Sequence, residues 1–86
     1  MATVLIIDDN PGVGAALKLL LSLRDIQAVT AATPAEGLAL LAREPVDLVI
    51  QDMNFSADTT SGDEGAALFR AIRRQQPELP VILLTG

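Results

Sequence analysis

The sequence predicts an α/β fold in which a doubly wound parallel sheet carries helices on both faces. Four short apolar runs alternate with three segments of helical periodicity, in the order β-α-β-α-β-α-β. The runs are continuously apolar rather than alternating, which is typical of strands that are buried on both sides. A chain of 86 residues has room for one domain, and we expect that domain to span residues 1–86.

Each element follows from a local pattern. The expected strands are the apolar runs at residues 3–7, 27–31, 46–52 and 81–85. The expected helices have apolar residues at helical spacing, with Leu17, Leu20 and Leu21 on the inner stripe of the first, and cover residues 11–24, 34–44 and 63–75. Asn10 and Thr33 are expected N-caps, because each is a capping residue type followed by a proline at the first helical position. A polar loop at 54–62 separates the third strand from the third helix.

Composition excludes several classes of protein. With 50% apolar and 20% charged residues, the chain is not intrinsically disordered. The absence of Cys and His excludes disulfides, zinc fingers and catalysis by thiol or imidazole. A net charge of −5 disfavours a nucleic-acid partner, and no apolar run reaches the roughly 18–20 residues of a membrane span. We therefore expect a cytoplasmic domain without a nucleic-acid or membrane partner.

Three carboxylates end neighbouring strands of the expected sheet. Asp8 and Asp9 follow the first strand and Asp52 closes the third, while Thr85 ends the fourth. Ligands of open parallel sheets bind beyond the carboxyl ends of the strands, so these side chains should meet in one acidic pocket. Crowded carboxylates repel one another, and a hard divalent cation such as Mg²⁺ relieves that repulsion. The alternative for each single Asp is that it only solvates a strand end or caps a helix.

Three sequence blocks resemble the receiver domain of bacterial two-component response regulators. They are Val4-Leu5-Ile6-Ile7-Asp8-Asp9-Asn10, Asp47-Leu48-Val49-Ile50-Gln51-Asp52-Met53-Asn54 and Pro80-Val81-Ile82-Leu83-Leu84-Thr85-Gly86. The blocks have the family's order and spacing along the whole chain. The resemblance implies a flavodoxin-like sheet of strand order 2-1-3-4-5 and a signalling phosphoacceptor rather than an enzyme, since any phosphoryl transfer is to the chain itself.

The resemblance also implies a role for each site residue. Asp52 matches the phosphoryl acceptor, and Thr85 matches the switch hydroxyl that turns toward the phosphoryl group. Asp9 matches a direct Mg²⁺ ligand, Asp8 a carboxylate that acts largely through water, and Met53 the residue that lends a backbone carbonyl. The phosphoryl donor would be a phosphohistidine on a partner histidine kinase or phosphotransferase.

Two departures from the family pattern shape the expectations. The family's fifth strand, the Lys at its end and the last helix have no counterpart within these 86 residues, where Lys18 is the one lysine. The resemblance is therefore to a receiver truncated to four strands and three helices, and phosphoryl transfer to Asp52 should be weak without that Lys. The loop at 54–62 is longer than usual, as in receivers attached to enhancer-binding transcription activators, so transcription is the expected output.

Two other functions stay open. A Mg²⁺-dependent phosphatase with an aspartyl-phosphate intermediate would place an acid two residues after its nucleophile, where this chain has Asn54, and would need a cap domain. A receiver-like interaction module with an incomplete site would not be phosphorylated at all.

An exposed fourth strand over residues 81–84 is apolar on both faces, which predicts a homodimer through that edge.

Overall fold

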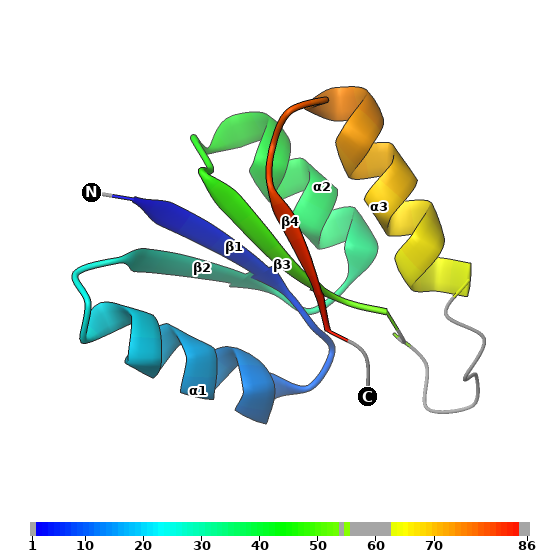
Figure 1. Ribbon diagram of the computed structural model, residues 1–86. Helices are drawn as coiled ribbons and strands as arrows, with labels where there is room; N and C mark the ends of the chain where they lie inside the picture. Colours follow the sequence, from blue (N-terminus) through cyan, green and yellow to red (C-terminus); the bar gives the residue numbers. More distant parts are fainter. Residues whose placement is uncertain (1, 54, 56–62, 85–86) are drawn as a thin grey trace.

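Four parallel strands form the single sheet around which the chain is built (Figure 1). The computed structural model describes residues 2–53, 55 and 63–84. The strands are β1 (Thr3–Ile7), β2 (Gln27–Ala31), β3 (Leu48–Asp52) and β4 (Val81–Leu84), in the order β2-β1-β3-β4. Because all the pairings are parallel, every strand ends at the same edge of the sheet. The predicted parallel α/β sheet is thus confirmed, with the strand order of the resemblance over these four strands.

Helices cover both faces of this sheet (Figure 1). Helix α1 (Pro11–Ser22) lies on one face, and helices α2 (Pro34–Arg43) and α3 (Asp63–Gln75) lie side by side on the other. Each face has its own apolar cluster, one centred on Leu5 and Ile7 beneath α2 and α3, the other on Val4 and Ile6 beneath α1. Successive residues of β1 therefore point into opposite layers, as the continuous apolarity of the strand predicted.

The predicted caps begin the first two helices. The Asn10 side chain accepts a hydrogen bond from the Gly12 N–H at 2.9 Å, and Thr33 Oγ1 accepts one from the Glu36 N–H at 3.1 Å. The Glu36 carboxylate reaches back to the Ala32 N–H at 3.2 Å, one residue before the cap. These bonds satisfy backbone donors that have no partner inside a helix.

Several sequence expectations differ in detail from the structure, and the second helix, for example, ends at Arg43 rather than residue 44. The first helix ends at Ser22 rather than near residue 24, because Asp25 adopts a positive φ of 58° in the turn that leads into β2. The third strand begins at Leu48 rather than residue 46. Leu20, expected on the inner stripe of the first helix, is 59% exposed, because α1 packs mainly over β2 and leaves this side chain outside that contact.

No helix in the described part of the chain is both long and apolar enough to span a bilayer.

Helix α2 approaches the sheet so closely that only a glycine fits at one position. A Cβ added at Gly37 would lie 2.5 Å from Ile7 Cδ1 and 2.8 Å from Ile7 Cγ1. Ile7 is fully buried in its cluster, so its side chain can turn away only by displacing packed neighbours. Gly37, which weakens an isolated helix, is therefore required by packing.

We expect Gly37→Ala to lower the free energy of unfolding by about 1–3 kcal/mol, because the added methyl overpacks the core around Ile7. The gain in helix propensity, up to about 1 kcal/mol, offsets part of this cost. Urea denaturation followed by circular dichroism measures the change. Ile7→Val removes Cδ1 and should reduce the cost of Gly37→Ala in a double-mutant cycle.

The matched control is Gly14→Ala in α1, where an added Cβ meets Thr30 Cγ2 at an ordinary 3.5 Å. This variant should be neutral or up to about 1 kcal/mol more stable, since only the propensity term applies. Equal losses in the two alanine variants would show that close packing at Gly37 is not the cause.

Candidate metal centre

Three carboxylates meet at the edge where the central strands end. Asp8 and Asp9 follow β1, and Asp52 is the last residue of β3. Ile7 is registered with Gln51, so the next residues, Asp8 and Asp52, emerge side by side. One carboxylate oxygen from each of the three lies within 4.8 Å of the others. The structure therefore brings together the three carboxylates that the sequence placed in one pocket.

Backbone hydrogen bonds fix the segments that carry these carboxylates. The Asp8 N–H donates to the Ala31 carbonyl at 3.0 Å, which extends the β1–β2 ladder by one residue. The Met53 N–H donates to the Leu84 carbonyl at 3.1 Å, which does the same between β3 and β4. The Asp8 carboxylate also accepts from the Asn10 N–H at 2.8 Å, the residue that caps α1. The cluster is therefore preorganised by the sheet and by the start of a helix.

The electrostatics of the cluster favour a cation. Partial burial raises the pKa of Asp8 above its usual range, the hydrogen bond from Asn10 opposes that rise, and the negative charges of Asp52 and Asp9 add to it. Three of these four causes, burial and the two neighbouring negative charges, reflect the cost of holding negative charge at this end of the sheet. A divalent cation with oxygen ligands would remove that cost.

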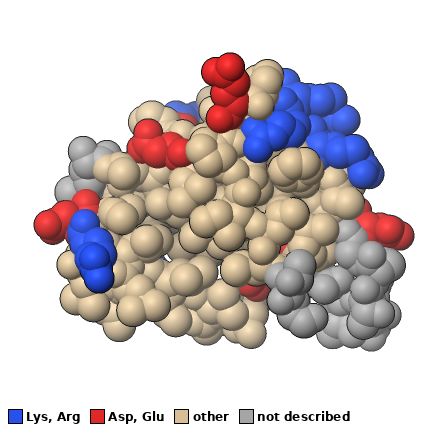
Figure 2. Space-filling view, in the orientation of Figure 1, with Lys and Arg blue, Asp and Glu red and all other residues tan. Residues whose placement is uncertain are grey.

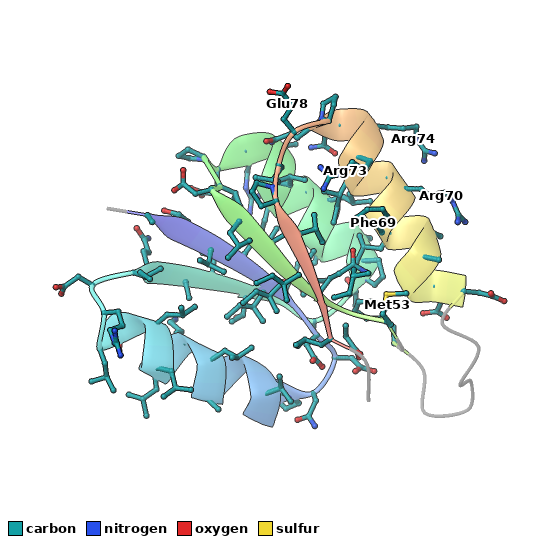
Figure 3. The ribbon with its side chains drawn as sticks, in the orientation of Figure 1. Met53, Phe69, Arg70, Arg73, Arg74 and Glu78 are labelled. Carbon is teal, nitrogen blue, oxygen red and sulfur yellow. The ribbon has the colours of Figure 1, made fainter. Side chains whose placement is uncertain are left out.

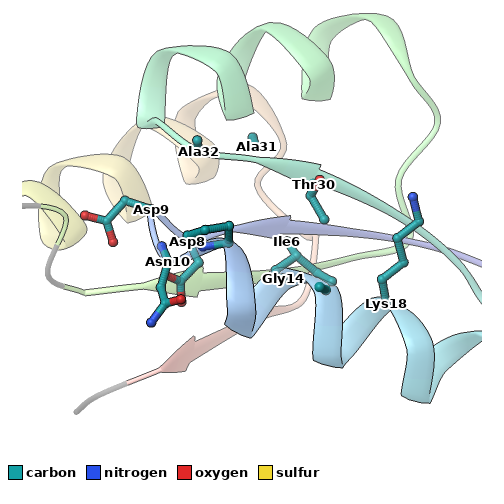
Figure 4. A pocket seen from close by; sticks show the side chains of 11 residues that line it. Ile6, Asp8, Asp9, Asn10, Gly14, Lys18, Thr30, Ala31 and Ala32 are labelled. Carbon is teal, nitrogen blue, oxygen red and sulfur yellow. The ribbon is translucent and has the colours of Figure 1, made fainter.

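A cavity of about 400 Å³ adjoins the cluster on the side of α1 and β2 (Figure 4). Asp8, Asp9 and Asn10 line one end, and Lys18 and Thr30 line the other. Asp52 does not line it, so the cavity opens beside the carboxylate cluster rather than over it.

The three arginines of α3 lie at the other end of that helix from the carboxylates. Figure 2 shows the positive charge gathered there, and Figure 3 labels Arg70, Arg73 and Arg74 on the last turns of α3. Arg73 donates to the carbonyls of Gln76 and Pro77 at 3.3 and 3.1 Å and lies over the Phe69 ring at 5.3 Å. These bonds satisfy carbonyl groups just beyond the C-terminus of α3, so the charge of Arg73 has a structural role there.

Sequence reasoning missed Gln51, which is fully buried directly before Asp52. Its side-chain nitrogen donates to the Gly65 carbonyl at 2.8 Å, and Oε1 has no partner among the described residues. The available signal was a single amide inside an otherwise apolar buried strand, since such a group needs a hydrogen-bonding reason to be there. Met53 is described and half-buried, whereas Asn54 and Thr85 lie outside the described residues.

We expect Asp8→Asn to raise the stability of the metal-free protein at neutral pH. The raised pKa means that ionised Asp8 disfavours the fold, and the variant removes that charge while Asn Oδ1 can still accept from the Asn10 N–H. The advantage of the variant should shrink as pH falls through the folded pKa of Asp8, because wild-type Asp8 is then protonated too. Chemical denaturation in EDTA at several pH values measures it.

The control is Glu78→Gln, which removes an exposed carboxylate from the turn that precedes β4. A gain equal to that of Asp8→Asn would attribute the effect to net charge alone, and a loss of stability in Asp8→Asn would contradict the electrostatic account.

Comparison with known proteins identifies the family. The response regulator receiver domain family matches residues 4–86. The transcriptional regulatory protein GlrR of Escherichia coli (strain K12) is 43% identical over 85 residues, covering 99% of this chain and 18% of GlrR. The C4-dicarboxylate transport transcriptional regulatory protein DctD of Rhizobium meliloti (strain 1021) is 34% identical, covering 98% of this chain and 17% of DctD. The chain thus spans less than a fifth of the length of these two regulators.

Solved structures agree with the sequence match. A response regulator receiver domain protein from Clostridium thermocellum superposes with a TM-score of 0.85 at 31% identity, covering 100% of this chain and 66% of that one. The response regulator TrrA of Thermotoga maritima, solved in complex with Mg²⁺–BeF, superposes with a TM-score of 0.85 at 28% identity, covering 99% and 70%. TrrA has also been solved in complex with the histidine kinase ThkA. With its sheet order, its carboxylate cluster and these matches, the chain belongs to the response regulator receiver domain family.

Proposed function

We propose that this receiver accepts a phosphoryl group from a partner histidine kinase onto Asp52, with Mg²⁺, and thereby switches the output of a transcription regulator. The observation that carries the proposal is the approach of Asp8, Asp9 and Asp52 to within 4.8 Å at the C-terminal edge of the sheet. Relatives named as transcriptional regulators and the TrrA complex with a histidine kinase support the output and the partner.

The residues present fit a magnesium ion. Three carboxylates offer hard oxygen ligands. The pKa of Asp8 is raised first by burial and then by the negative charges of Asp52 and Asp9, and a bound cation would offset these effects. Asp8, Asp9 and Asp52 would hold the ion together with the backbone carbonyl of Met53. When bound, Mg²⁺ neutralises charge on the phosphoryl oxygens.

The chain's own part in the transfer is to present a nucleophile in a fixed position. A carboxylate oxygen of Asp52 attacks phosphorus, the P–N bond of the phosphohistidine breaks, and the electron pair returns to the imidazole of the kinase. Carboxylates are weak nucleophiles, so positioning and charge neutralisation provide most of the acceleration. Thr85 is proposed as the hydroxyl that responds to the phosphoryl group.

The test is phosphorylation by acetyl phosphate and Mg²⁺, with intact mass spectrometry as the readout. We expect a low yield of a single phosphoryl adduct on the wild-type chain and none on Asp52→Asn, because the amide oxygen does not form an acyl phosphate. Omission of Mg²⁺ should remove most of the adduct. The control Asp47→Asn changes an exposed carboxylate just before β3 and should leave the adduct unchanged.

An unmodified wild-type chain would instead favour the receiver-like interaction module with an incomplete site. Turnover of a phosphate ester with repeated release of phosphate would favour the phosphatase. The two results differ, because the module gives neither adduct nor turnover.

We also propose that the 86-residue chain forms a homodimer through β4. Ile82 is 48% exposed and Leu83 is 42% exposed on this edge strand, and burial of apolar surface stabilises association by about 25 cal/mol per Å². Light scattering at micromolar concentration should give about twice the 9.0 kDa chain mass, and Leu83→Lys should shift the protein toward monomer.

The matched control is Leu23→Lys, which places the same charge on an exposed leucine just after α1, away from β4. A wild-type monomer, or equal dissociation by both lysine variants, would contradict dimerisation through this edge.

A further inference from the structure

Gln51 is a buried polar side chain directly behind the proposed metal site. It has no exposed surface, and it lies in one row with Ile7 and Leu83, its registered neighbours on β1 and β4. Alternate residues of a strand share a face, so Gln51 points to the same side as Val49, toward α3 and away from α1. An apolar side chain of similar length would fill this space, so packing alone does not account for an amide.

The amide of Gln51 joins the acceptor strand to the first turn of α3. Its nitrogen donates to the Gly65 carbonyl at 2.8 Å and lies 3.3 Å from the carbonyl of Asp52. It also lies 3.8 Å from the sulfur of Met53. A single side chain therefore contacts the acceptor residue, the residue after it and the start of a helix that is distant in sequence.

Gly65 completes this contact from the side of the helix. A Cβ at this position would lie 2.4 Å from Met53 Cα, 2.5 Å from its carbonyl oxygen and 2.7 Å from its carbonyl carbon. The first turn of α3 thus rests directly on the peptide of Met53, which Figure 3 shows beside that end of the helix. The opposite side of the same residue is held by the bond from its N–H to the Leu84 carbonyl.

We propose that Gln51 is a positioning residue that clamps α3 onto the end of β3 and so fixes the Met53 carbonyl, a metal ligand in the proposed function. The inference rests on the proposed metal site, and Gln51 would act on that site through Met53 and Gly65 rather than bind the ion itself. Groups that orient metal ligands from behind commonly change metal affinity by about 10–100-fold when they are removed.

The test compares wild type with Gln51→Met, which keeps the length of the side chain and removes its donor. In the metal-free chain, amide hydrogen exchange at Met53 should become at least about tenfold faster, because the peptide loses its clamp. In a calorimetric titration with Mg²⁺ alone, the dissociation constant should rise by about 10–100-fold.

The matched control is Ile72→Val, a conservative change in the buried face of the same helix, one residue before Arg73 and away from Met53. This variant perturbs the core without removing the Gln51 amide, so it distinguishes a general loss of stability from a loss of the fixed position of Met53. It should leave the Mg²⁺ affinity and the amide exchange of Met53 close to wild type. Equal effects of Gln51→Met and Ile72→Val on both readouts would overturn the inference.

A measurement on the wild-type chain covers the case in which Gln51→Met fails to fold. The side-chain amide resonances of Gln51 should shift on addition of Mg²⁺, and unchanged resonances at saturating Mg²⁺ would overturn the inference. Absence of Mg²⁺ binding by wild type would overturn the proposed function itself, whereas Met53 exchange in the metal-free variant would still decide whether Gln51 holds that peptide.

Discussion

The parallel pairing of β1 with β3 is the constraint on which the site depends. Because Ile7 is registered with Gln51, the residues that follow them, Asp8 and Asp52, must leave the sheet side by side. Carboxylates separate when they are free to do so, and the apolar strand cores keep these together against their repulsion. The burial of Leu5, Ile6 and Ile7 stabilises the fold. Part of this free energy offsets the repulsion between the carboxylates that the strands hold together at one end of the sheet.

The helices on the two faces of the sheet contact the carboxylate-bearing end of the strands in different ways. On the side of α2 and α3, glycines allow unusually close contact, with Gly37 against Ile7 and Gly65 against the Met53 peptide. On the other side, α1 contributes its N-terminus through Asn10, while Leu19 on this helix and Leu23 just after it are exposed. The close glycine contacts therefore lie on the side of the sheet where α2 and α3 pack.

The buried side-chain amide of Gln51 lowers the stability of the fold next to the proposed metal site. Oε1 of Gln51 is buried and has no partner among the described residues, and such an acceptor costs about 1–3 kcal/mol, whereas an apolar side chain there would carry no such cost. The hydrogen bonds of its nitrogen to two backbone carbonyls offset part of that cost and tie β3 to α3. The position of the last residues of β3 is therefore coupled to the position of α3, the next helix along the chain.

The sequence alone determined the fold class, the strands, both N-caps and the three acidic residues, because these follow from local patterns of period, residue type and position at strand ends. Tertiary structure decided the distances among Asp8, Asp9 and Asp52, the need for glycine at positions 37 and 65, and the outward placement of Leu20. It also revealed the role of Gln51, whose partner Gly65 lies 14 residues away. Local periodicity cannot report such features, because each depends on which distant backbone packs against the residue.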